Sequence, residues 1–152
     1  MKLDDKLFLQ VIDATPLVSI DLIIHNEAGQ VLLGRRSNRP AQGYWFVPGG
    51  RITKNEKIDA ALKRISEVEI GVSLERPVLL GVYDHIYEDN YAGTAGINTH
   101  YVVIAYRGQF PTGAVVTPDP QHSALKWWDT EAILNSPEAH QNTKAYFSHK
   151  VL

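Results

Sequence analysis

The stretch "GGRITKNEKIDAALKRISEVEIGV", from Gly49 to Val72, is the feature that most constrains this chain. It opens with two adjacent glycines and closes at Gly71, a residue type that commonly ends helices. Between them, apolar residues recur at helical spacing: Ile58, Ala61, Leu62, Ile65 and Val68. This period predicts a helix over residues 56–70 with that apolar face buried. The glycines before it and the carboxylates of Glu56 and Glu69 suggest a loop and helix that hold a metal ion and a phosphate.

Segments rich in β-branched and aromatic residues flank this stretch. "LVSIDLII" and "QVLLGRR", separated by the turn-forming "NEAG", predict a hairpin. Further strands are predicted within "WFV", "PVLLGVYDHIYED", "THYVVIAYRG" and "QHSALKWWD", and helices within "TEAILNS" and "PEAHQNTKAYF". The mixture predicts an α/β fold with a mixed sheet.

Composition narrows the class of protein. The 152 residues, 44% of them hydrophobic, fit one domain over residues 1–152. Fifteen basic against seventeen acidic residues indicate no nucleic-acid or membrane partner. The chain has no cysteine, which excludes disulfides, thiolate metal sites and a cysteine nucleophile. It also shows no leader-like or membrane-spanning segment, so we expect a cytoplasmic protein.

The predicted helix carries few acids on one face. At about 100° per residue, Glu67 lies roughly 200° around the helix from Glu69, whereas position 65 lies one turn before Glu69 on the same face. Positions 65 and 68, however, are Ile65 and Val68. A metal ion over that face would therefore meet Glu69 alone.

The spacing of Gly50, Glu56, Arg64, Glu69 and Gly71 resembles the Nudix box. In that family's pattern, glutamates would stand in place of Ile65 and Val68. The same gaps are typical of one branch, the GDP-mannose mannosyl hydrolases, which the chain also resembles in "TPLVSIDLII", "LLGRRSNRPAQGYWFVPGGR", "GVYDHIYEDNYAGT", "THYVV" and "PDPQHSALKWW". The resemblance implies a Nudix fold, an α/β/α sandwich around a mixed sheet.

The resemblance also implies a Mg²⁺ site. Its ligands would be the Glu69 carboxylate, the backbone carbonyl of Gly49 and the side chain of Gln121. Mg²⁺ accepts such a set, because one carboxylate can suffice when diphosphate oxygens, neutral carbonyls and water complete the shell.

The chemistry implied by this branch is attack of water at C1 of the sugar, which expels the whole nucleoside diphosphate. A GDP leaving group clamped by Mg²⁺ and arginine needs no general acid. His122 in "PDPQH" is the candidate base, because an imidazole can be neutral near pH 7. Direct attack by water predicts inversion at C1.

Arginines suit a diphosphate because they carry a permanent charge and fork-shaped donors. The resemblance assigns this role to Arg36 and Arg51. Alternation along a strand sends Arg35 to the face opposite Arg36, so one of the two should reach the site. Arg39 has a weaker claim than Arg36 and Arg51.

Four further residues have alternative interpretations. Tyr101 could donate its hydroxyl to a phosphate or pack as a strand aromatic. Asp21 could bind sugar hydroxyls or stand as a strand-edge acid. Arg64 could pair with Glu56 or act near the metal. His85 could order its neighbouring loop or play a structural part at the strand end.

The sequence thus predicts a Mg²⁺-dependent hydrolase of a GDP-hexose, with mannose first. The alternatives are an ordinary Nudix pyrophosphohydrolase of a nucleoside diphosphate derivative and a non-catalytic nucleotide-sugar-binding module. Sugar choice is expected to depend on the loop "NYAGTAGIN". The branch is typically a homodimer with N-terminal contacts, for which "LFLQVI" offers apolar residues, although these could equally pack within one subunit.

Overall fold

The computed structural model describes residues 2–116 and 122–148. Its strands are β1 (Leu17–His25), β2 (Val31–Arg36), β3 (Trp45–Phe46), β4 (Gly49–Arg51), β5 (Glu75–Tyr87), β6 (Thr99–Gln109) and β7 (His122–Trp128). Its helices are α1 (Asp5–Ala14), α2 (Ile58–Ile70), α3 (Thr130–Asn135) and α4 (Gln141–Lys144). The described helices include none that is long and apolar enough to cross a membrane.

The strands form a mixed sheet in the order β3-β2-β1-β6-β5, with β4 paired to β1 and β7 paired to β2. The central pair β1 and β6 is parallel, and the other pairs are antiparallel. The predicted hairpin of β1 and β2 is confirmed, with His25 opposite Val31. The mixed sheet predicted from the alternation of elements is thus also confirmed.

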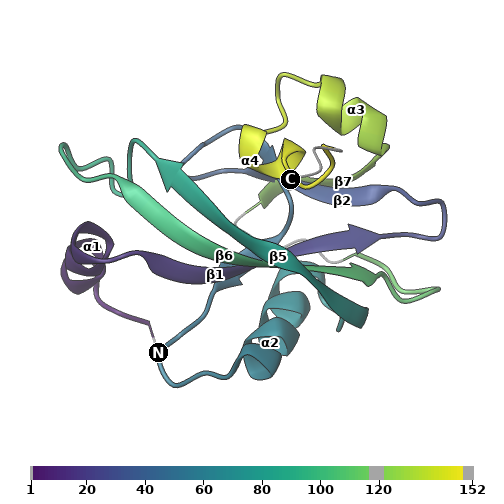
Figure 1. The fold of residues 1–152 in the computed structure, drawn as a ribbon, viewed down its shortest axis with the longest axis horizontal. Helices are drawn as coiled ribbons and strands as arrows, with labels where there is room; N and C mark the ends of the chain where they lie inside the picture. Colours follow the sequence, from purple (N-terminus) through teal and green to yellow (C-terminus); the bar gives the residue numbers. More distant parts are fainter. Residues whose placement is uncertain (1, 117–121, 149–152) are drawn as a thin grey trace.

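Helices cover both faces of the sheet (Figure 1). Alternation along β1 sends Ile20, Leu22 and Ile24 to one face, where they pack with Ala61, Ile65 and Ile70 of α2. Ile23 points to the opposite face, which is covered by Ile133 of α3 and by Phe147 near the C-terminus. This arrangement is the predicted α/β/α sandwich.

The predicted buried face of α2 is partly wrong. Ile58 is 45% exposed and Val68 is 54% exposed. Ile58 is the first residue of the helix and Val68 stands at the rim of a pocket, whereas Ala61, Ile65, Ser66, Glu69 and Ile70 are buried. The buried face therefore includes a carboxylate. The predicted stop at Gly71 is confirmed: its φ is 77°, a left-handed conformation that favours glycine.

The helix predicted over residues 137–147 is also shorter than expected. Only Gln141–Lys144 is helical, because the preceding residues pair with β3 instead. The Trp45 amide donates to the Glu138 carbonyl at 2.9 Å, and the His140 amide donates to the Trp45 carbonyl at 3.1 Å. These bonds join the C-terminal segment to the sheet.

The N-terminal helix α1 packs within the same chain. Asp4 caps it by accepting a hydrogen bond from the Leu7 amide at 2.9 Å. Ile12 is buried, and the Phe8 ring lies 5.3 Å from the ring of Tyr91. Leu7 stays 43% exposed, so one apolar position of this helix remains open to solvent.

Candidate active site

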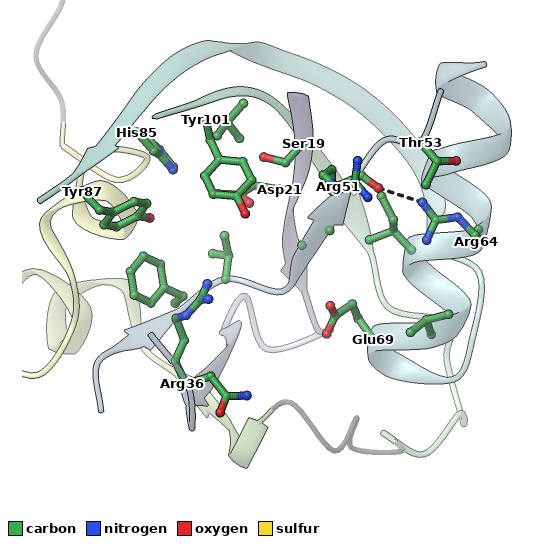
Figure 2. A pocket seen from close by; sticks show the side chains of 18 of the residues that line it. Ser19, Asp21, Arg36, Arg51, Thr53, Arg64, Glu69, His85, Tyr87 and Tyr101 are labelled. Carbon is green, nitrogen blue, oxygen red and sulfur yellow. Dashed lines mark hydrogen bonds between the residues drawn. The ribbon is translucent and has the colours of Figure 1, made fainter. Parts of the chain in front are cut away.

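A pocket of about 480 Å³ opens between α2 and the end of β5 (Figure 2). Its α2 side is formed by β4 and α2, with Gly49, Arg51, Ile65, Val68 and Glu69. Its β5 side is formed by Asp21 of β1, His85 and Tyr87 of β5, and Tyr101 of β6. Arg36 at the end of β2 lines the same pocket, and its side chain points inward between these two sides.

The α2 side offers one helix carboxylate to the pocket. Glu69 is 4% exposed and lines it, whereas Glu67 is exposed and lies 4.0 Å from Lys63. Ile65 belongs to the core beneath the glycines: a Cβ on Gly50 would lie 3.1 Å from it. The expectation that only Glu69 faces the site from this helix therefore agrees with the structure.

The oxygen atoms that the pocket offers fit a hard cation. The pocket holds the Glu69 carboxylate and the hydroxyls of Ser19 and Thr53 beside Gly49. Within residues 2–116 and 122–148, no three His, Cys, Asp or Glu side chains gather to hold an ion by themselves. Mg²⁺ suits such a site, because it keeps several waters and is commonly bound through one or two carboxylates plus substrate phosphates.

The side chain of Arg36 has a position and a donor that suit an anionic ligand. Its guanidinium lies 5.4 Å from the centre of the Phe46 ring, and its Nε is buried with no hydrogen-bond partner among the described residues. An unpaired buried donor is costly, and a phosphate oxygen would satisfy it. Arg35 behaves differently, as predicted: it is exposed and donates through Nε to the Gly43 carbonyl at 3.3 Å.

Arg64 forms the ion pair with Glu56 that the sequence suggested, and it also lines the pocket. Its Nε donates to Glu56 Oε2 at 2.7 Å and its Nη2 to Glu56 Oε1 at 2.9 Å. The same Nη2 donates to the Arg51 carbonyl at 2.8 Å, the bond drawn in Figure 2. Hydrogen bonding from Arg64 lowers the pKa of Glu56 to about 2, so this carboxylate stays charged and fixes the backbone that presents Arg51.

The β5 side contains titratable groups with shifted pKa values. Burial raises the pKa of Asp21 to about 7, although the hydrogen bond from Tyr146 and the charge of Arg36 lower it. Burial and the neighbouring His140 lower the pKa of His85 to about 4, so this imidazole is neutral near pH 7. Burial also raises the pKa of Tyr101, against the nearby charges of Arg36 and Arg51. Perturbed groups of this kind cluster at functional sites.

The structure places the other predicted residues as follows. The backbone of His122 begins β7 opposite Arg36, which brings this position to the Arg36 end of the pocket. Gln121 lies outside the described residues. Arg39 lines a separate open pocket beside Tyr44 and Glu88.

Several residues of this region were not predicted from the sequence, including Ser19, Thr53, Tyr87 and Tyr146. Tyr87 lines the pocket on the same strand face as His85, and strand alternation could have revealed it. Tyr146 binds Asp21 from the C-terminal segment, and no local pattern indicates that contact.

The loop "NYAGTAGIN" does not line this pocket in the described part of the chain, and its expected role in sugar choice stays a prediction. Its Asn90 is fully buried and donates to the carbonyls of Thr94 and Ile97 at 2.9 and 2.8 Å. The Tyr91 hydroxyl donates to the Asp5 carbonyl at 3.1 Å. The loop is therefore held together by hydrogen bonds of Asn90 and is packed against α1.

Comparison with known proteins identifies relatives across most of the chain. The family model of the NUDIX domain matches residues 15–151. The low-salt glycan biosynthesis protein Agl8 of Haloferax volcanii is 41% identical over 117 residues, which are 76% of this chain and 72% of that protein. The crystal structure of a MutT NUDIX hydrolase from Burkholderia pseudomallei has a TM-score of 0.68 and 32% identity, with 88% of this chain and 96% of that chain covered. A MutT protein from Methanosarcina mazei Go1, 23% identical, has a TM-score of 0.71 over 88% of this chain and 92% of that chain, which shows the shared fold.

Proposed function

The chain belongs to the Nudix hydrolase family, and we propose that it hydrolyses a GDP-hexose, with GDP-mannose as the first candidate, to GDP and the free sugar. Water attacks C1 of the hexose, and the bond between C1 and the diphosphate oxygen breaks. GDP leaves with the bonding electrons, and the proton of water passes to a base of the protein.

The observation that carries this proposal is the single carboxylate that α2 presents to the pocket. Ordinary Nudix chemistry at phosphorus uses several glutamates of the box to hold metal ions and to orient water. Here Ile65 lies in the core and Val68 stands at the rim, so Glu69 is the one acid of α2 that lines the site. Expulsion of GDP from a sugar carbon needs fewer acidic residues, because this leaving group requires no proton from a general acid.

The side chains of the pocket supply the remaining requirements. Arg36, with its unpaired Nε, and Arg51 would bind the diphosphate and stabilise the charge that develops on it. Glu69 and Gly49, with Gln121, would hold Mg²⁺, which when bound supplies electrostatic stabilisation of the leaving diphosphate. His122, opposite Arg36 in the β2–β7 register, would take the proton from water.

The hexose would lie toward the β5 side of the pocket. There Asp21 can accept hydrogen bonds from sugar hydroxyls, and Tyr101 can donate to a phosphate oxygen at the junction with the diphosphate. The likeness to a glycan biosynthesis protein supports a substrate of the nucleotide-sugar class.

We also propose that the protein acts as a homodimer. Several apolar side chains of α1, β1 and β5 are exposed: Leu7, Val18, Val82 and Ile86. Covering such side chains with a second copy would remove apolar surface from water. Light scattering on the purified protein tests this, and a monomeric mass at micromolar concentration would contradict it.

Product identification tests the proposed reaction. The protein is incubated with Mg²⁺ and GDP-mannose, GDP-glucose or GDP-fucose, and both products are identified by chromatography and mass. GDP with free sugar is the expected result. GMP with sugar phosphate would instead indicate an ordinary Nudix pyrophosphohydrolase. Binding without turnover in excess Mg²⁺ would indicate a non-catalytic module.

A further inference from the structure

Tyr146 connects two residues of the pocket from outside it. Its hydroxyl donates to Asp21 Oδ2 at 2.7 Å and lies 3.4 Å from His85 Nε2. Asp21 and His85 line the pocket, whereas Tyr146 lies behind them. These partners lie 125 and 61 residues from Tyr146 along the chain, so the contact exists only in the folded protein.

The single hydroxyl proton sets the direction of this small network. Because the proton of Tyr146 is donated to Asp21, the hydroxyl oxygen can serve His85 only as an acceptor. A hydrogen bond from His85 to this oxygen therefore requires a proton on Nε2, which leaves Nδ1 as the acceptor of the neutral ring. Tyr146 thereby orients the Asp21 carboxyl group and favours the His85 tautomer with its proton on Nε2.

The second oxygen of Asp21 is also confined. A Cβ on Gly49 would lie 2.5 Å from Asp21 Oδ1, so only glycine leaves room for the carboxylate at this point. Asp21 is thus held between the backbone of β4 on one side and the Tyr146 hydroxyl on the other. A carboxylate fixed in this way presents its remaining acceptor sites in one direction.

The segment that carries Tyr146 is itself firmly placed. The pairing of Glu138 and His140 with Trp45 ties it to β3, and Phe147 is buried in the core cluster beneath α3. The Tyr146 ring packs edge-on against Tyr83, with 4.9 Å between centroids. The hydroxyl therefore reaches Asp21 from a rigid support.

We propose that Tyr146 is a positioning residue that fixes Asp21 and His85 for recognition of the hexose, so that the C-terminal segment 137–147 sets the sugar preference of the site. The inference rests on the proposed GDP-hexose substrate. It replaces the loop 90–98, which packs against α1, as the determinant of sugar choice.

The test compares Tyr146→Phe with Tyr83→Phe. Both substitutions remove one hydroxyl from the same aromatic pair, but only Tyr146 is bonded to Asp21. For each variant, kcat/KM is measured for GDP-mannose and GDP-glucose, together with the Kd of GDP, which lacks a hexose. Thermal unfolding establishes that both variants are folded.

Tyr146→Phe should lower kcat/KM for the preferred hexose about tenfold, which is within the range for the loss of one buried hydrogen bond. The ratio between the two hexoses should shrink, the Kd of GDP should stay within about twofold, and Tyr83→Phe should leave all three quantities unchanged. In an Asp21→Asn background, Tyr146→Phe should add little, because the hydroxyl acts through that carboxyl group.

An unchanged hexose ratio in Tyr146→Phe would overturn the inference, as would an equal loss of GDP affinity or a wild-type protein without hexose preference. Failure of the proposed reaction is visible separately. Release of GMP and sugar phosphate would refute the proposed bond cleavage. The ratio of kcat/KM between the two GDP-hexoses would still test the role of Tyr146.

Discussion

The two sides of the pocket are held in place by contacts of very different range. On the α2 side, Arg64 joins Glu56 and the Arg51 carbonyl, which lie 8 and 13 residues away. On the β5 side, Tyr146 reaches Asp21 across 125 residues. The first side is a local loop and helix, and the second is assembled from strands and the C-terminal segment. We infer that the α2 side, with the His122 position, governs rate, whereas the β5 side governs which sugar is accepted.

The largest effect is expected at His122. His122→Gln should lower kcat about 10²–10⁴-fold, the usual contribution of a positioned base, without changing the ratio between hexoses. Kinetics on GDP-mannose and GDP-glucose measure both quantities. His100→Gln is the control, because His100 pairs with Asp84 outside the pocket. A variant at full rate would remove His122 from the mechanism, and an altered hexose ratio would break the division between the two sides.

Glu69→Gln should be next in size. It removes the one α2 carboxylate of the pocket and should lower Mg²⁺-dependent turnover about 10²–10³-fold, since metal stabilisation of a leaving group amounts to several kcal/mol. Glu67→Gln, on the exposed face of the same helix, should change the rate by less than about twofold. Equal losses in the two variants, with folding intact, would contradict a site built on Glu69 alone.

Glu56→Gln should mainly affect stability. Arg64 lowers the pKa of Glu56 to about 2, below its ordinary value of 4.5, so the pair stabilises the fold fully above about pH 5. That stabilisation is lost as the pH falls toward 2. Because Arg64 is 42% exposed, solvent screens the pair, and we expect the variant to lose about 1 kcal/mol at pH 7.

Urea unfolding at a series of pH values measures this effect. The difference between wild type and Glu56→Gln should shrink between about pH 5 and pH 2. A difference that stays constant over this range would show that the charge of Glu56 does not stabilise the α2 side.

The smallest effect is expected at Tyr91. Tyr91→Phe removes the hydrogen bond from the loop 90–98 to the Asp5 carbonyl, and neither Tyr91 nor Asp5 lines the pocket. The hexose ratio should stay within about twofold of wild type. The same panel of GDP-sugars measures it. A change as large as that of Tyr146→Phe would return sugar choice to this loop.

The range of the contacts also explains what the sequence could predict. The hairpin, the long strands, α2 and its Gly71 stop follow from periodicity and from residues that favour turns, which are local signals. Glu69 could be chosen over Glu67 because both stand on one helix of known geometry. Strand alternation likewise predicted that one of Arg35 and Arg36 reaches the site, while the choice of Arg36 came from the family resemblance.

Other features required the folded chain. Residues 137–140 carry a helical pattern but pair with β3, because backbone bonds to Trp45 outweigh local preference. Ile58 and Val68 fit the helical period, yet both are exposed, Ile58 as the first residue of α2 and Val68 where the helix lines the pocket. The contact of Tyr146 with Asp21 has no counterpart in spacing or composition, since it depends on the position of the C-terminal segment relative to β1.

The most direct test of the account is the position of isotope after hydrolysis in ¹⁸O-water. If Ile65 and Val68 mark the loss of chemistry at phosphorus, water must reach the sugar carbon while Arg36 and Arg51 hold the departing diphosphate. We predict that mass spectrometry finds ¹⁸O on C1 of the released hexose and none in GDP, and that the first-formed sugar has the inverted anomeric configuration. Label in a phosphate group would contradict the account and would show that the ordinary Nudix reaction persists with Glu69 as the one α2 carboxylate.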